Sequence, residues 1–367
     1  MRFNQGIVDV HVHVHGGCGV DNFLRNTRDH ISTSGVDMEN LLCVKTGPSA
    51  CITETQALLA KAVYPGKFSV LGNPTFIVEP FGITAEGVAG QVRDFLEAGL
   101  DGVKLGYGNA GRETPLDSEV FDPMFSVLEE FRAPILYHIG TFPYTPPRRV
   151  FQKNRSQVQY PPFVLYQGPQ DEDQPEKQIG PMDMNEPFFE QTEKFLEKHP
   201  DLNLILPHMY FMADDLDRLA DFIDRHPNVN IDLTPAFQLY YYMSQDPEKS
   251  RDFLCTYRKR FLFGSDNWIE ADPTLTLINE RTFFETDEAF FSAHWGVDLH
   301  GINLPKDVLE DIYRNNYMRL FPKREVDPKK AAVYVEKVFD IVRNLEELPE
   351  SNKMDVLEAA KRFRSMI

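Results

Sequence analysis

The chain has 367 residues, of which 42% are apolar and 26% are charged, a composition typical of a globular protein with a large core. Its net charge of -18 argues against nucleic acid or an anionic membrane as a partner, because both require basic patches, whereas a small-molecule substrate responds to local charge. No apolar run reaches the roughly 18 residues of a membrane span, no signal-peptide segment precedes the first strand, and the four cysteines are too few for a disulfide framework. We therefore expect a cytoplasmic protein, and a homo-oligomer is compatible with these properties.

The first predicted strand runs from Gly6 to Val14 and carries two histidines. Its apolar residues indicate a buried strand, which the pair Gly16 and Gly17 would end. His11 and His13 are two positions apart, so both point to one face of the strand. Imidazole is the commonest metal ligand in proteins, and the pair could form half of a metal site. Two hydrogen-bonded core histidines are the alternative, and the pair alone does not decide between them.

Strands and helices alternate after this point. The segment 20–36 shows no clear helical stripe, but a helix is expected from Thr84, a capping residue, to Gly99, a typical helix end. Further helices are predicted at 54–63 and 118–131. Strands are predicted at 41–45, 68–71, 102–105 and 134–138.

Periodicity is lost between residues 141 and 185, which contain many prolines. A segment of this length is unusually long for a connection within a compact domain, so it is predicted to form a lid or a wall of a binding site. Helices ending at His199 and His226 then lead into new strands, and both histidines are expected to be helix-end residues. The remaining predictions are strands at 202–206, 229–233 and 261–264, an irregular stretch at 265–304, a helix at 306–321 and two amphipathic helices at 328–367.

The order of these elements predicts an α/β fold. Eight apolar strands that alternate with helices, without turn-only hairpins, require a parallel sheet. Eight such units in about 320 residues favour a closed (β/α)8 TIM barrel, with an open doubly wound sheet as the alternative. We expect a barrel over residues 1–327, with the insertion 141–185 after the fifth strand, and a C-terminal helical extension over 328–367.

Polar residues follow the ends of four predicted strands. His11 and His13 lie near the end of the first, His138 ends the fifth, His208 follows the sixth and Asp266 follows the eighth. The carboxyl ends of all strands in a parallel barrel open on one face, where active sites are built. The sequence therefore predicts that these residues converge on a metal site.

These motifs resemble the amidohydrolase superfamily, in particular the amidohydrolase-related (amidohydrolase 2) branch that contains carboxymuconate-semialdehyde decarboxylase. The resemblance spans residues 6–321 and leaves out the two long loops and the tail. The motifs that carry it are Asp9-Val10-His11-Val12-His13, Leu136-Tyr137-His138-Ile139-Gly140, Leu206-Pro207-His208-Met209 and Phe263-Gly264-Ser265-Asp266-Asn267-Trp268.

The resemblance implies a role for each polar residue. A divalent metal, usually zinc with manganese and iron as alternatives, would be held by His11, His13, His138 and Asp266, and this donor set suits those metals. His208 and Asp266 would be catalytic, with His208 beside a metal-activated water. In binuclear members a carboxylated lysine bridges two ions, and Lys104 stands in a similar context. A lysine that pairs with a carboxylate or with a substrate anion is the alternative for Lys104.

Candidate substrate-binding residues lie in the loops. Arg148 and Arg149, close to Tyr144, could clamp a substrate carboxylate, and Trp268 is a further candidate. The glycine pattern at 106–111 is not followed directly by a helix, which argues against a dinucleotide site. The tyrosines at 240–242 could stack on a ligand, line the barrel mouth or pack against the lid.

The resemblance leaves the reaction open. The branch contains hydrolases of amides, esters and lactones as well as metal-dependent non-oxidative decarboxylases. Its aromatic-acid decarboxylases often have glutamate where this chain has His11, which favours hydrolysis of a small cyclic or aromatic ester, lactone or amide. Decarboxylation of a small aromatic or unsaturated carboxylic acid is the first alternative, and a non-catalytic metal-binding protein is the second.

Overall fold

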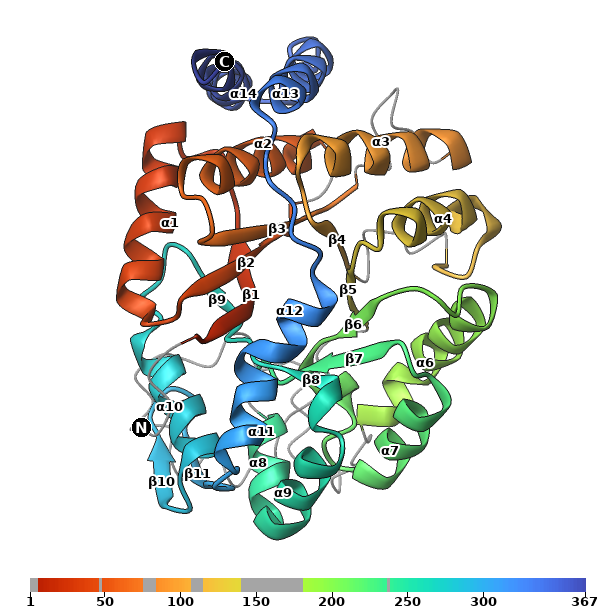
Figure 1. Cartoon of the computed structure of the whole chain (residues 1–367), viewed down its shortest axis with the longest axis vertical. Coiled ribbons are helices and arrows are strands. Elements are labelled where there is room, and N and C mark those ends of the chain that lie inside the picture. Colours follow the sequence, from red (N-terminus) through yellow and green to blue (C-terminus); the bar gives the residue numbers. More distant parts are fainter. Residues whose placement is uncertain (1–5, 46–47, 75–83, 107–114, 140–180, 236–237) are drawn as a thin grey trace, which may run out of the picture.

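The computed structural model describes residues 6–45, 48–74, 84–106, 115–139, 181–235 and 238–367. Within them, nine strands form a sheet in the order β8-β7-β6-β5-β4-β3-β2-β1-β9, in which every neighbouring pair is parallel (Figure 1). The strands are β1 (Val8–Val14), β2 (Met38–Cys43), β3 (Phe68–Gly72), β4 (Gly102–Gly106), β5 (Ile135–His138), β6 (Leu204–Leu206), β7 (Val229–Asp232), β8 (Phe261–Leu262) and β9 (Asn267–Trp268).

The two ends of this sheet belong to one stretch of chain. β8 pairs with β7, and β9, which begins a few residues later, pairs with β1. Between them, the Val10 N–H donates to the Phe263 carbonyl at 3.0 Å, and the Asp266 N–H donates to the His11 carbonyl at 3.0 Å. The stretch therefore bridges β7 and β1 and closes the sheet. The predicted (β/α)8 barrel is confirmed, and the open-sheet alternative is wrong.

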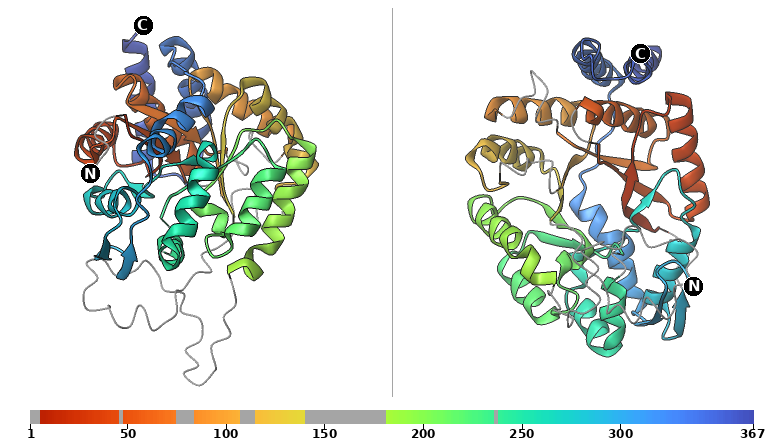
Figure 2. Two further views of the ribbon diagram at one scale, coloured as in Figure 1. Left: turned by 60° about the horizontal axis from the view of Figure 1, so that its bottom comes forward. Right: turned by 180° about the vertical axis from the view of Figure 1, so that it is seen from behind.

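Helices surround the strands, as Figures 1 and 2 show from three directions. The expected ends of α3 are confirmed, because the Thr84 hydroxyl accepts from the Gly87 N–H at 3.1 Å and Gly99 takes a left-handed φ of 117°. The surrounding helices are α1 (Val20–Ser34), α2 (Pro48–Val63), α3 (Ala85–Ala98), α4 (Asp122–Phe131), α6 (Pro181–Lys198), α7 (Leu216–Arg225), α8 (Gln238–Gln245), α9 (Pro247–Thr256) and α10 (Thr274–Glu285).

In most strands of the sheet, residues on opposite faces belong to two separate apolar clusters. The outer cluster joins the strands to the surrounding helices, and β5 contributes Ile135 and Tyr137 to it. Leu136, between them, belongs to a smaller cluster with inward residues of other strands. Because successive side chains of a strand point to opposite faces, the smaller cluster is the interior of the barrel. Its members are Val8, Val10, Leu42, Leu71, Leu136, Ile205, Leu262, Tyr317, Leu320 and Phe321.

One end of the barrel is covered by α11 (Lys306–Glu310), a π-helical turn (Asp311–Asn315) and α12 (Asn316–Leu320), which confirms the helix predicted there. These helices lie across the strands in Figure 1. The last turn supplies Tyr317 to the inner cluster. Asn203, just before β6, donates from Nδ2 to the Leu320 carbonyl at 2.8 Å, which places α12 at the amino ends of the strands. The opposite end, where the strands finish, is the mouth.

Helices α13 (Pro328–Val342) and α14 (Glu350–Ser365) form the expected C-terminal pair and lie outside α2 and α3 (Figures 1 and 2). Buried polar contacts hold this pair. The Tyr334 hydroxyl donates to Glu54 at 2.9 Å, and Asp355 accepts from the Gln56 side chain at 3.1 Å. In the described part of the chain, no helix is both long and apolar enough to cross a membrane.

Three sequence-based expectations were wrong. Most of the segment 20–36 forms helix α1, whose buried face includes polar Thr27 and His30. The Thr27 hydroxyl donates to the Phe23 carbonyl and His30 bonds Glu39, so the buried stripe is not apolar throughout. The stretch 265–304 contains helix α10 and an antiparallel hairpin of β10 (Ala289–Ser292) and β11 (Val297–His300). The last residues of the predicted insertion begin α6, and the rest of the insertion lies outside the described residues.

Candidate metal centre

A β-bulge in β1 turns both histidines into the barrel. Asp9 pairs with Glu39 of β2 and Val12 pairs with Leu41, so β1 advances three residues where β2 advances two. One extra residue is therefore inserted in β1, which defines a bulge. Val10 points inward before the bulge and Val12 points outward after it, so the bulge reverses the order of inner and outer positions and His11 and His13 face inward. The Asp9 carboxylate accepts the His11 N–H at 3.0 Å and the Ser265 N–H at 3.0 Å, which ties the bulge to the stretch after β8.

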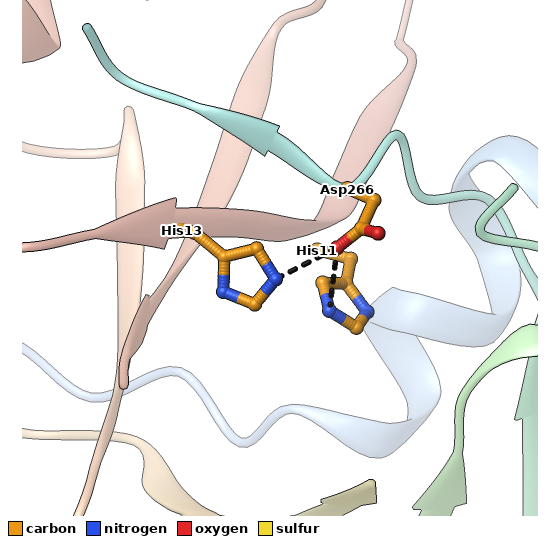
Figure 3. A group of neighbouring side chains, drawn as sticks. All are labelled: His11, His13 and Asp266. Carbon is orange, nitrogen blue, oxygen red and sulfur yellow. Dashed lines mark hydrogen bonds and ion pairs between the residues drawn. The ribbon is translucent and has the colours of Figure 1, made fainter. Parts of the chain in front are cut away.

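His11, His13 and Asp266 meet at the mouth (Figure 3). Asp266 Oδ1 lies 2.7 Å from His13 Nε2 and 3.5 Å from His11 Nε2, and the three ligand atoms lie within 4.8 Å of one another. Metal–ligand bonds near 2.1 Å at tetrahedral angles place ligand atoms about 3.4 Å apart. His11 Nε2 is buried and has no hydrogen-bond partner among the described residues. Two imidazoles and a carboxylate so arranged fit a divalent metal ion.

Asp232, at the end of β7, is a site residue that the sequence analysis missed. Its Oδ2 accepts from His11 Nδ1 at 2.8 Å, and its Oδ1 accepts the backbone N–H groups of His208 at 3.0 Å and Thr234 at 3.1 Å. A proton on His11 Nδ1 leaves the lone pair on Nε2, the atom that faces Asp266. Such a carboxylate partner fixes the tautomer and the ring orientation of a metal-ligating histidine. Its position at a strand end, like that of His138, was the available signal.

Burial and local charge set the protonation of this pair. Burial lowers the pKa of His11 to about 4, although the charge of Asp232 opposes the shift. Burial alone would raise the pKa of Asp232, but its interaction with His11, which includes the hydrogen bond from Nδ1–H, outweighs burial and lowers this pKa to about 2. For Asp266 the hydrogen bond from His13 likewise outweighs burial, and its pKa lies below the ordinary value. A neutral imidazole flanked by carboxylates is the form that binds a cation.

His208 lies in a strained turn after β6. The residues His208–Phe211 all have φ between 53° and 58°, and Asp266 has φ 58°. Left-handed backbone costs roughly 1–2 kcal/mol for each non-glycine residue, and such strain is concentrated at functional sites. The His208 Nδ1–H donates to the Thr234 carbonyl at 3.1 Å. The His208 ring centroid lies 5.6 Å from that of His11 and 5.0 Å from that of His138. The His208 ring, including its second nitrogen, Nε2, therefore lies at the barrel mouth.

Two further predicted ligands lie near this centre. His138 ends β5, and burial holds its pKa well below the ordinary value, so its imidazole is neutral. It is not part of the group formed by His11, His13 and Asp266, and its role as a ligand stays a prediction. Lys104 is buried on β4, where burial lowers its pKa to about 8 against the charges of Asp232 and Asp266. Carboxylation of Lys104 also stays a prediction.

The predicted substrate-binding residues are only partly placed. The Trp268 ring stacks on His15, with centroids 3.8 Å apart, and on His13, with centroids 4.7 Å apart, so it supports a candidate ligand. Tyr240 is buried, packs against Phe283 and donates to the Leu233 carbonyl at 2.8 Å, which makes it a core residue. Arg148, Arg149, Tyr144 and most of the glycine-rich stretch 106–111 lie outside the described residues.

Comparison with known proteins gives a family match and a set of similar structures. A family model described as Amidohydrolase matches residues 53–323, which include His138, His208, Asp232 and Asp266. No curated protein matches the chain.

Three similar solved structures are decarboxylases by name. A dihydroxybenzoic acid decarboxylase from Polaromonas sp. JS666, with bound manganese and the inhibitor 2-nitroresorcinol, is 12% identical over 86% of this chain and 96% of its own, with a TM-score of 0.52. The 5-carboxyvanillate decarboxylase from Sphingomonas paucimobilis is 13% identical over 87% and 99%, with a TM-score of 0.50. The 2,6-dihydroxybenzoate decarboxylase from Rhizobium is 13% identical over 86% and 98%, with a TM-score of 0.50. At these identities the likeness is one of fold.

Proposed function

The chain belongs to the amidohydrolase family, and on that premise we propose that it is a metal-dependent non-oxidative decarboxylase of a small aromatic or unsaturated carboxylic acid. The observation that carries the proposal is the meeting of His11, His13 and Asp266 at the barrel mouth, with His208 beside them. The names of the similar structures support decarboxylation as the reaction.

The proposal gives the mouth residues two tasks. His11, His13 and Asp266 hold a divalent ion, and His138 is proposed as a further ligand. When bound, the ion supplies Lewis-acid polarisation of a substrate oxygen and fixes the orientation of the substrate. Asp232 keeps the ligating nitrogen of His11 unprotonated, because it accepts the proton of the other ring nitrogen at 2.8 Å.

His208 is proposed as the acid. Loss of CO2 breaks a carbon–carbon bond and leaves its electron pair on the substrate carbon, which must then receive a proton. The Thr234 carbonyl accepts from His208 Nδ1–H, so the ring is held in one orientation and Nε2 is the atom that carries and delivers the proton. His208 regains that proton from solvent after the product leaves, which balances the step.

Hydrolysis of an ester, lactone or amide is the second candidate. One observation favours it: His11 stands where aromatic-acid decarboxylases of the resembling branch often have glutamate. The sequence alone placed hydrolysis first, whereas the names of three similar structures support decarboxylation. Non-catalytic metal binding is the least favoured, because structural zinc sites are closed shells of cysteine and histidine, whereas this group includes a carboxylate, lies at the barrel mouth and has His208 beside it.

A substrate panel tests the proposal. The purified protein, loaded with manganese or zinc, is incubated with hydroxybenzoates and carboxyvanillates and, separately, with aryl esters, lactones and amides, while CO2 and acid release are followed. We expect metal-dependent CO2 release, and His208→Gln should keep its metal but lose activity about 100-fold or more. Acid release without CO2 would establish the hydrolase instead. No turnover in either set with any divalent metal would reject both reactions.

A further inference from the structure

Lys104 points into the barrel beside the metal centre. Val103 and Leu105, its neighbours on β4, both belong to the outer apolar cluster, so the side chain between them faces the interior. Lys104 pairs in register with Leu136, whose side chain belongs to the inner cluster. The residue is only 4% exposed. The cationic side chain of Lys104 therefore lies in the apolar interior and extends towards the mouth.

The ammonium of Lys104 has no partner in the described part of the chain. Its Nζ is buried without a hydrogen bond, and no described carboxylate lies within 4.0 Å to form an ion pair. Another buried lysine, Lys61, is fully paired: its Nζ donates to both carboxylate oxygens of Asp101 at 2.8 Å and to the Gly99 carbonyl at 2.7 Å. Because a buried, unpaired charge is costly, Lys104 requires an anionic partner that the described residues do not provide, and an anionic ligand would be such a partner.

The charge of the centre favours an anion as that ligand. Asp232 and Asp266 are the carboxylates whose charges act on Lys104, and a divalent ion would balance the two of them. The ammonium of Lys104 then has no carboxylate of its own among the described residues, and one anionic group of a substrate would neutralise it.

We propose that Lys104 binds an anionic oxygen of the substrate and thereby selects small organic monoanions, such as carboxylates, over their neutral analogues. The inference rests on the proposed function, because it takes the site to be a metal-dependent catalytic centre. It makes Lys104 a specificity-determining residue that keeps its free amine. The carboxylated form is the opposite assignment, since it would place a third anionic group beside Asp232 and Asp266.

Binding of a matched pair of probes tests this role without turnover. Benzoate and benzamide have nearly the same shape and differ in charge, and calorimetry gives the affinity of the metal-loaded protein for each. We expect the wild type and Lys323→Met, a change at a lysine 88% exposed, to prefer benzoate at least tenfold. Lys104→Met should lose that preference with its metal content unchanged, and Lys104→Arg should keep part of it. Lys104→Gln is a second uncharged variant should the Met variant not fold.

Three outcomes would overturn the inference. The first is a wild type that does not distinguish benzoate from benzamide, and the second is a Lys104→Met variant that keeps the preference. The third is a carbamate on Lys104, seen as a labelled carbon signal after incubation with carbon-13 bicarbonate and accompanied by loss of metal in Lys104→Met. Failure of the proposed function is distinguishable: benzoate binding that depends on Lys104 without CO2 release from any acid would reject the decarboxylase and leave the anion site standing.

Discussion

Replacing Asp232 with asparagine tests how the second carboxylate of the centre acts. Asparagine has the same shape, and its Oδ1 can still accept the backbone N–H groups of His208 and Thr234. Its Nδ2 would then face His11 Nδ1, 2.8 Å away in the wild type, where one donor meets another. His11 can accept that hydrogen bond only by moving its proton to Nε2, the atom that faces Asp266.

The expected cost follows from these contacts. The opposite orientation of the amide would set its N–H against two backbone N–H groups, so the change of tautomer is the less costly response. Loss of a carboxylate that supports a metal-ligating histidine typically lowers metal affinity 10- to 100-fold, which is about 1.4–2.7 kcal/mol. We therefore expect Asp232→Asn to bind manganese or zinc 10- to 100-fold more weakly than the wild type.

Competition against a fluorescent metal indicator measures this difference. Asp201→Asn is the matched control, because Asp201 is exposed and the charge change is the same. The control should bind metal as the wild type does. Equal affinities in all three proteins would refute the reasoning, since they would mean either that His11 is not a ligand or that Asp232 does not set its tautomer.

Gly264→Ala should weaken metal binding in the same titration, because a Cβ would lie 2.9 Å from His11 Cβ and 2.7 Å from Thr234 Oγ1; unchanged affinity would contradict this packing. Glu54→Gln should flatten the pH dependence of thermal stability. Burial raises the pKa of Glu54 from 4.5 to about 8, so the wild type loses stability as pH rises across that range, by at most about 1.4 kcal/mol per pH unit; parallel melting curves would exclude this. Tyr334→Phe should lower the free energy of unfolding by about 1–3 kcal/mol, because a buried oxygen of Glu54 loses its donor, and an unchanged urea midpoint would count against that contact.

The convergence of His11, His13 and Asp266 could be predicted from sequence because it follows from topology. Once the strands are parallel and the sheet closes, residues at the carboxyl ends of strands share one face. Asp232 could not be singled out in the same way. Its role depends on the bulge in β1, because the bulge turns His11 inward with its Nδ1 towards β7. The residue types in β1 do not predict this bulge.

Helices α1 and α10 escaped prediction because polar side chains occupy their buried faces. In α1, His30 is buried and bonds Glu39 at 2.9 Å, so the helical period is hidden by a residue whose partner lies on another element. In α10, Asn279 and Glu280 are buried beside apolar residues, and no apolar stripe remains. A periodic pattern of apolar residues identifies the buried face of a helix only where the buried side chains are themselves apolar.

Diffraction from manganese-loaded crystals, recorded on both sides of the manganese absorption edge, would locate the ion itself. The metal centre described above predicts an anomalous difference peak at the barrel mouth, in contact with His11 Nε2, the His13 ring and Asp266. A peak at another place, or no peak in crystals of a protein saturated with manganese, would contradict the metal centre and the decarboxylase built on it.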